Sequence, residues 1–143
     1  MIQRKQTLFL LAVAIIAVIL LFVPFFSYTS NISDGTFTLL NATGKLSNAY
    51  FLMIINNMVI LIALITIFLF KKRTVQFKLS NLLILLNIFI TGLAFLLPFE
   101  HDQIKAYATL WAFLPVVTAL FSYLAAHFIK KDDQLVRNAD RIR

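Results

Sequence analysis

Four long stretches without any Asp, Glu, Lys or Arg residue constrain this chain more than any other feature of its sequence. Each has the length of roughly 20 residues that an α-helix needs to cross about 30 Å of bilayer hydrocarbon. They cover residues 8–28, 48–70, 79–99 and 106–129. Because 61% of the 143 residues are hydrophobic and only 13% are charged, a water-soluble fold is excluded. The sequence predicts an all-α membrane protein, one domain over residues 1–143 with four transmembrane helices in an up-down-up-down bundle.

The distribution of basic residues predicts how this bundle is oriented. Lys and Arg gather before the first span, between the second and third, and after the fourth, whereas the opposite side holds only Lys45 and Lys105. Since positively charged connections stay in the cytoplasm, both termini and the central connection are predicted to be cytoplasmic. Bulky residues follow the first span where a signal peptidase needs small ones, so we expect an uncleaved anchor. Aromatic residues mark the outer span ends: Tyr28, Tyr50, Tyr107 and Trp111.

Polar residues inside the spans are the next feature of interest. No Asp, Glu, Lys or Arg lies within a span, which disfavours a proton-coupled transporter. Amide and hydroxyl side chains at this depth commonly form hydrogen bonds between helices. The candidates for such contacts are Asn56, Asn57, Asn87 and Thr91. Thr91 lies near the level of Asn57 and is its expected partner. In the alternative hypothesis, a small oligomeric transporter or channel, the same four residues would line the pathway.

Residues suited to enzyme chemistry are scarce. The chain has no Cys, which removes thiolate catalysis and Cys-ligated metals. The outer trio Glu100, His101 and Asp102 lacks a second ligand cluster, because His127 lies at the other side of the membrane. We therefore predict no catalytic, cofactor-binding or metal-binding residue, no cofactor and no nucleic-acid partner. A membrane enzyme that uses the outer trio is a third hypothesis.

The two soluble segments with the clearest patterns are the outer connection and the tail. Asp34-Gly35 followed by Thr-Phe-Thr-Leu predicts a small hairpin lying on the bundle. An apolar residue recurs every seven positions at Phe128, Leu135 and Ile142. This spacing predicts that the fourth span continues as a helix into the cytoplasmic tail, residues 130–143. Its acidic residues are expected to pair with the basic central connection. The predicted cytoplasmic interaction face consists of Arg4, Gln6, Arg73, Gln76, Lys78, Asp132, Arg137, Asp140 and Arg141.

The three charged segments carry a family resemblance. They run over residues 1–8 (MIQRKQTL), 70–79 (FKKRTVQFKL) and 129–143 (IKKDDQLVRNADRIR). Together they resemble an uncharacterised family of small four-span inner-membrane proteins, a domain-of-unknown-function family typical of the Bacteroidota. The resemblance covers the whole chain, and its most specific part is the terminal Lys-Asp-x-x-Leu-Val-Arg-x-x-Asp-Arg-Ile-Arg pattern.

That resemblance implies a multi-pass protein of the bacterial inner (cytoplasmic) membrane with all three charged segments in the cytoplasm. It brings no known activity, cofactor or substrate. Together with the one-sided polar patterning, it favours a non-enzymatic accessory or scaffolding subunit. Such a subunit would bind a membrane-protein complex or anionic lipid through its cytoplasmic face. The sequence does not specify an oligomeric state.

Overall fold

The computed structural model describes residues 3–29, 34–42, 49–70, 72–96, 99–101 and 104–141. The helices are α1 (Gln3–Phe22), α2 (Leu39–Ala42), α3 (Ala49–Phe68), α4 (Arg73–Leu96), the 3₁₀ turn η1 (Leu110–Phe113) and α5 (Leu114–Arg141). The strands are β1 (Pro24–Thr29), β2 (Asp34–Thr38), β3 (Phe99–His101) and β4 (Ile104–Ala108).

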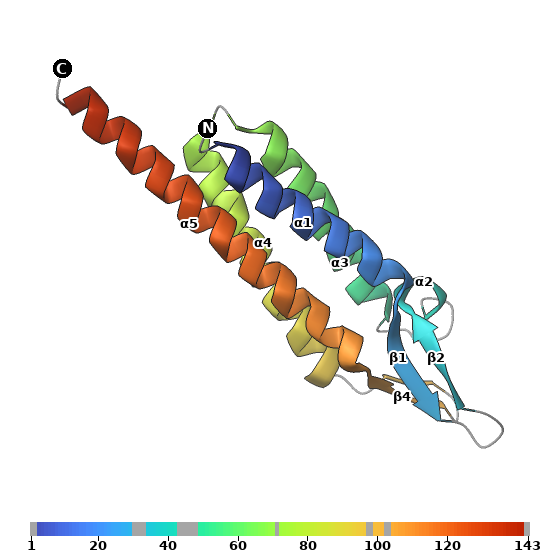
Figure 1. The fold of residues 1–143 in the computed structure, drawn as a ribbon. Coiled ribbons are helices and arrows are strands. Elements are labelled where there is room, and N and C mark those ends of the chain that lie inside the picture. Colours follow the sequence, from blue (N-terminus) through green and yellow to red (C-terminus); the bar gives the residue numbers. More distant parts are fainter. Residues whose placement is uncertain are drawn as a thin grey trace.

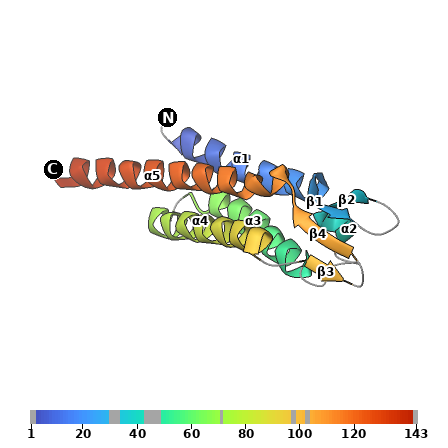
Figure 2. The same ribbon diagram turned by 90° about the horizontal axis from the view of Figure 1, so that it is seen from below.

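Four long helices pack side by side as a bundle (Figures 1 and 2). Around the bundle, α1 packs against α3 and α5, and α4 packs against the same two helices. Buried alanines such as Ala17, Ala63 and Ala125 let the backbones approach closely, as is common between membrane helices. All four helices are long and apolar enough to cross a membrane, which confirms the predicted fold class.

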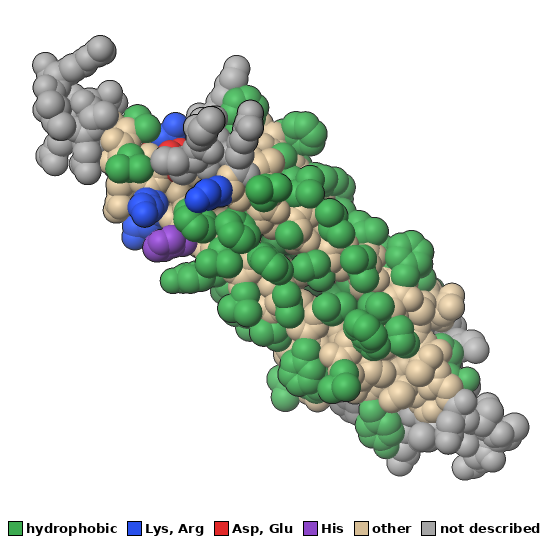
Figure 3. Space-filling model, viewed as in Figure 1, with side chains coloured by type: hydrophobic (Ala, Val, Ile, Leu, Met, Phe, Trp, Pro, Cys, Tyr) green, Lys and Arg blue, Asp and Glu red, His purple; other side chains and the backbone are tan. Residues whose placement is uncertain are grey.

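On the face seen in Figure 3, the surface of the bundle is apolar over its middle part. Large side chains such as Phe68, Leu85 and Leu120 are more than half exposed. A water-soluble bundle would bury such residues, whereas lipid tails solvate them as well as a protein core does. The surface pattern therefore agrees with the membrane placement that the sequence indicates.

The helix ends differ from the predicted span limits at several places. The second span agrees closely, because α3 covers Ala49–Phe68 against the predicted 48–70. However, α4 begins at Arg73, ahead of residue 79, and the Lys72 carbonyl accepts the Gln76 N–H at 3.0 Å. Charged residues are good helix formers, so a helix does not end where its apolar segment ends. The span limits predicted which residues contact hydrocarbon, and they did not predict where each helix begins and ends.

A four-stranded antiparallel sheet, which the span analysis did not predict, occupies one end of the bundle (Figure 1). Its strand order is β2-β1-β4-β3. Strand β1 uses residues assigned to the first span, and β4 overlaps the start of the predicted fourth span at residues 106–108. Pro24 cannot continue the hydrogen bonding of α1, and the aromatic residues after it favour a strand. An apolar run alone does not separate strand from helix.

A hairpin near Asp34 is part of this sheet, but Asp34 and Gly35, expected to form its turn, lie in strand β2. Strands β1 and β2 pair in antiparallel register, with Tyr28 opposite Gly35 and Thr29 opposite Asp34. The Tyr28 ring stacks on Phe37 with 4.3 Å between centroids, and it covers Gly35 so closely that a Cβ there would lie 2.6 Å from the Tyr28 Oη. A side chain at position 35 would therefore require this ring to move.

The sheet also joins the start of the last helix to the end of the first. The Thr109 hydroxyl donates to the Pro24 carbonyl at 2.6 Å, and the Thr109 N–H donates to the Phe25 carbonyl at 3.1 Å. Phe25 and Phe26 of β1 are fully buried, and their rings meet edge to face with 4.9 Å between centroids. This end of the molecule, here called the sheet end, is thus closed by backbone pairing and aromatic packing.

The opposite end carries the starts of α1 and α4, the end of α3 and the far part of α5. We call it the charged end. Helix α5 has 28 residues and a length of about 42 Å, so it exceeds the roughly 30 Å of a bilayer core. It runs without interruption to Arg141 and extends past the other helices (Figure 1). The predicted tail from residue 130 is therefore the continuation of α5 as far as the structure describes it.

Candidate functional site at the charged end

The bundle brings the predicted interaction residues from three helices to the charged end. Gln6 comes from α1, Arg73, Gln76 and Lys78 come from the first turns of α4, and Asp132 comes from α5. Four further residues of the predicted face lie in α1 and α5, but the structure does not describe their side chains: Arg4, Arg137, Asp140 and Arg141.

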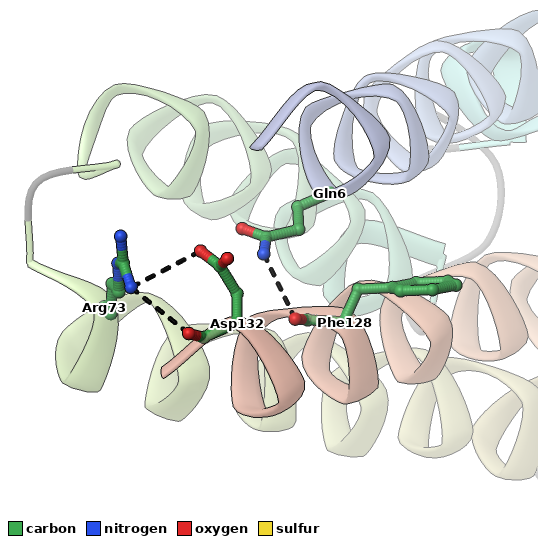
Figure 4. Close-up of polar contacts among 4 residues, drawn as sticks. All are labelled: Gln6, Arg73, Phe128 and Asp132. Carbon is green, nitrogen blue, oxygen red and sulfur yellow. Dashed lines mark hydrogen bonds and ion pairs between the residues drawn. The ribbon is translucent and has the colours of Figure 1, made fainter. Parts of the chain in front are cut away.

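Arg73 and Asp132 form an ionic contact at this end (Figure 4). The Arg73 Nη1 lies 3.5 Å from the Asp132 Oδ2 and donates to the Asp132 backbone carbonyl at 3.3 Å. The two side chains are 26% and 11% exposed, respectively. The expected pairing between the central connection and the tail helix is thus made by Arg73, and it links α4 to α5.

Gln6 links α1 to the same part of α5. Its Nε2 donates to the Phe128 carbonyl at 3.1 Å, and the side chain is buried (Figure 4). One turn further along α1, the Phe9 ring stacks on Phe128 with a centroid distance of 5.5 Å. Gln6 was predicted to face a partner, but its amide is used inside the bundle. Its contribution is to hold the N-terminus of α1 against α5.

Gln76 also differs from its predicted place on the interaction face. It is only 2% exposed, and its Nε2 donates to the Thr66 carbonyl of α3 at 3.2 Å. The Gln76 backbone carbonyl accepts a hydrogen bond from the Ser80 hydroxyl at 3.0 Å. Polar residues near a helix end look solvent-exposed in the sequence, yet a side chain on the inner face finds carbonyls of a neighbouring helix.

The outer part of the charged end is strongly basic. Several lysines are exposed there, and in the part of the chain that the structure describes cations outnumber acids. Figure 3 shows Lys and Arg side chains and a His gathered at this end. The cations are Lys5, Lys72, Arg73, Lys78, Lys130 and Lys131, and the acids are Asp132 and Asp133.

A groove of about 240 Å³ lies between α4 and α5 at this end. Its polar lining comes from Arg73, Thr74, Lys130 and Asp133, and its apolar lining comes from Phe77 and Ile129. The sequence analysis singled out neither Lys130 nor Thr74. Their place in the groove depends on how α4 packs against α5, for which the sequence carries no local signal.

The polar residues in the interior form contacts between helices. Asn56 is 1% exposed, and its Nδ2 donates to the Ala17 carbonyl of α1 at 2.9 Å. Asn87 is 2% exposed; its Nδ2 donates to the Leu83 carbonyl at 2.7 Å, and its Oδ1 accepts the Thr118 hydroxyl of α5. These two asparagines therefore join α3 to α1 and α4 to α5.

The expected contact between Asn57 and Thr91 is not made. The Asn57 Nδ2 donates to the Met53 carbonyl and the Thr91 hydroxyl donates to the Asn87 carbonyl, each at 3.0 Å and each within its own helix. The carbonyl four residues earlier is the nearest acceptor for such side chains. Depth alone predicts which residues lie at one level, but it does not predict which way they face.

Thr118 is the interior partner that the sequence analysis did not predict. The number of residues from Arg73 to Asn87 equals that from Thr118 to Asp132, so one antiparallel register accounts for both contacts between α4 and α5. The Thr118 hydroxyl also lies 2.8 Å from the Pro115 carbonyl, and the Ser122 hydroxyl donates to the Thr118 carbonyl at 2.8 Å. Two polar contacts therefore fix one register along the longest helix pair.

Among the described residues, no group of three His, Asp or Glu side chains lies close enough to hold a metal ion. The side chains of the outer trio Glu100, His101 and Asp102 lie outside the described part of the chain.

Four apolar helices, a sheet at one end and a basic opposite end define a multi-pass membrane protein. The chain belongs to the family described as a domain of unknown function (DUF4293), whose profile matches residues 2–142. This confirms the predicted membership of an uncharacterised family. Neither a curated protein nor a solved structure matches the chain.

Proposed function

We propose that this protein is a non-enzymatic accessory or scaffolding subunit of the bacterial inner membrane. In this proposal both termini and the charged end lie in the cytoplasm, and the charged end binds a partner membrane-protein complex. Its exposed lysines and the projecting part of α5 form the contact surface. The buried Gln6 and Gln76 hold the helices that carry this surface.

The observation that carries the proposal is the contrast between the interior and the charged end. The buried Asn56 and Asn87 have their hydrogen-bond partners inside the protein. No buried side-chain polar atom among the described residues lacks a partner. At the charged end, by contrast, Lys72 and Lys78 at the start of α4 and Lys131 on α5 are exposed. Exposed charge held on a fixed frame suits recognition of an acidic partner surface.

The alternative of a small oligomeric channel or transporter gains less support. A pathway needs polar side chains that face water or a substrate. Asn56 and Asn87 are nearly inaccessible and bond to neighbouring helices of the same chain, while Asn57 and Thr91 bond within their own helices. These contacts serve helix packing.

The test is affinity purification in mild detergent followed by quantitative mass spectrometry, with the full chain and with a variant lacking residues 135–143. The deletion leaves the contacts of Gln6, Arg73 and Asp132 in place. We expect the truncated protein to accumulate in the membrane and to lose the partners that the full chain recovers. Recovery of the same partners by the truncated protein, or no enriched partner for the full chain, contradicts the proposal.

The orientation is tested with single-cysteine variants, because the chain has no Cys of its own. The variants are Thr36→Cys at the sheet end and Lys78→Cys at the charged end, because both positions are exposed. A membrane-impermeant maleimide added to spheroplasts should label Thr36→Cys, and it should label Lys78→Cys only after permeabilisation. The reverse pattern would place the charged end outside.

A further inference from the structure

The groove between α4 and α5 lies where the apolar surface of the bundle meets its charged end. Phe77 and Ile129 form its apolar lining, and Arg73, Thr74 and Lys130 contribute polar groups. In a membrane this level corresponds to the boundary between acyl chains and headgroups. A molecule that fits here must therefore be amphipathic.

Its basic groups are arranged to receive an anion. Asp132 engages only Nη1 of Arg73 in the contacts described, and a guanidinium has further donors on its other nitrogens. Lys130 is exposed and takes part in no ion pair within the described part of the chain. The contact with Asp132 also fixes the guanidinium beside the groove, so less side-chain entropy is lost on binding.

The start of α4 adds further donors on the same side of the groove. Arg73 and Thr74 are the first two residues of the helix, where backbone N–H groups lack partners within the helix and the dipole favours negative charge. The Thr74 side chain is exposed, so its hydroxyl is accessible from the groove. Asp133 lines the groove as well, and its negative charge opposes an anion. An anion is therefore best placed on the α4 side, near Arg73, Thr74 and Lys130.

We propose that this groove binds the phosphate headgroup of an anionic phospholipid, with the acyl chains lying over Phe77 and Ile129. The proposal rests on the proposed function, because it requires the charged end to lie at a membrane surface. A soluble phosphate ester would satisfy the basic groups but would leave the apolar lining unused. Binding of a lipid in the groove differs from a general attraction between lysines and anionic membranes, because it depends on the residues that line the groove.

Two adjacent lysines provide a matched pair for the test. Lys130 lines the groove, whereas its neighbour Lys131 is also exposed but lies outside it. Replacing either by Gln removes one positive charge from the same helix turn. Since a basic residue near an anionic surface contributes about fivefold in affinity, K130Q should weaken groove binding by about that factor. K131Q should change it less than twofold.

The measurement is native mass spectrometry of the purified full chain, titrated in detergent with palmitoyl-oleoyl phosphatidylglycerol or with the matching phosphatidylcholine. We expect the protein to bind one molecule of phosphatidylglycerol in preference to phosphatidylcholine. K130Q should weaken this binding more than K131Q does, and D133N should strengthen it. Equal loss in K130Q and K131Q, or equal retention of both lipids, overturns the proposal. Displacement of the lipid by glycerol 3-phosphate at a similar concentration would instead assign the groove to a soluble ester.

Failure of this proposal and failure of the proposed function are distinguishable. Lipid selectivity is measured on the purified protein without any partner, and the deletion of residues 135–143 leaves every residue that lines the groove in place. A protein that recovers its partners but shows no lipid preference refutes the lipid site alone. Unchanged unfolding behaviour of K130Q and K131Q shows that both variants are folded.

Discussion

At the sheet end, segments distant in the sequence are joined by backbone hydrogen bonds between strands and by packed aromatic rings. At the charged end, single side chains reach carbonyls or a carboxylate on a neighbouring helix. The first arrangement spreads its stability over many backbone groups and a buried core. The second depends on a few contacts and leaves most of its charges exposed. This difference suits a sheet end that closes the bundle and a charged end that binds.

The largest effect is expected from Phe25→Ala at the sheet end. Phe25 is fully buried and contacts the ring of Phe26, so its truncation removes apolar contacts and leaves a cavity. We expect a loss of about 3 to 5 kcal/mol in the free energy of unfolding, measured by titration with sodium dodecyl sulfate in mixed micelles. Phe22→Ala is the control, because that ring is 66% exposed and should cost far less. Similar losses in both variants would contradict the buried role of Phe25.

Gly35→Ala tests the fit of the Tyr28 ring over the hairpin. The added Cβ would lie 2.6 Å from the Tyr28 Oη, so the ring must move away from its stack on Phe37. We expect a loss of about 1 to 3 kcal/mol in the same titration. In a Tyr28→Ala background the substitution has no ring to displace, and its cost should largely vanish. An unchanged cost in that background would show that the ring is not the cause.

Asp132→Ala tests the ionic contact at the charged end. It removes the carboxylate from Arg73 but leaves the Asp132 backbone carbonyl as an acceptor. Because Asp132 is buried but its partner Arg73 is 26% exposed to solvent, we expect a loss of about 1 to 2 kcal/mol, smaller than at the sheet end. Asp132→Asn keeps a polar acceptor and should lose about half as much. A loss as large as that of Phe25→Ala would remove the contrast between the two ends.

Thr118→Val gives the smallest expected effect. It deletes the donor to the Asn87 Oδ1 inside the bundle, and hydrogen bonds between membrane helices are typically worth about 1 kcal/mol. Thr91→Val is the matched control, since the Thr91 hydroxyl bonds only to the Asn87 carbonyl of its own helix. The Thr118 variant should unfold at a lower detergent fraction than the Thr91 variant. The opposite order would show that the contact between α4 and α5 contributes nothing.

The sequence predicted those features that depend on hydrophobicity and charge. Four spans, the continuation of the last helix and the pairing between the tail and the central connection all follow from segment length or opposite charge. The sheet was not predicted as a whole, because Phe25 and Phe26 continue an apolar run that reads equally well as helix. Asp34-Gly35 predicted a hairpin at this place in the chain, although the two residues lie in strand β2.

The sequence also did not predict the direction in which polar side chains point. Gln6 and Gln76 look exposed in the sequence because they lie among charged residues, yet both bond inward to neighbouring helices. Asn87 was recognised as a contact residue, but its partner Thr118 follows only from the register between α4 and α5. Register depends on how two helices pack together, and local sequence carries no record of it.

The central claim is that the protein associates through its charged end and not through its sheet end. The direct measurement is photo-crosslinking in intact cells, with p-benzoylphenylalanine placed at Lys78 or at Thr36, two exposed positions at opposite ends. The account predicts a discrete adduct with another membrane protein from position 78 and none from position 36. An adduct from position 36 alone, or the same adduct from both positions, would contradict it.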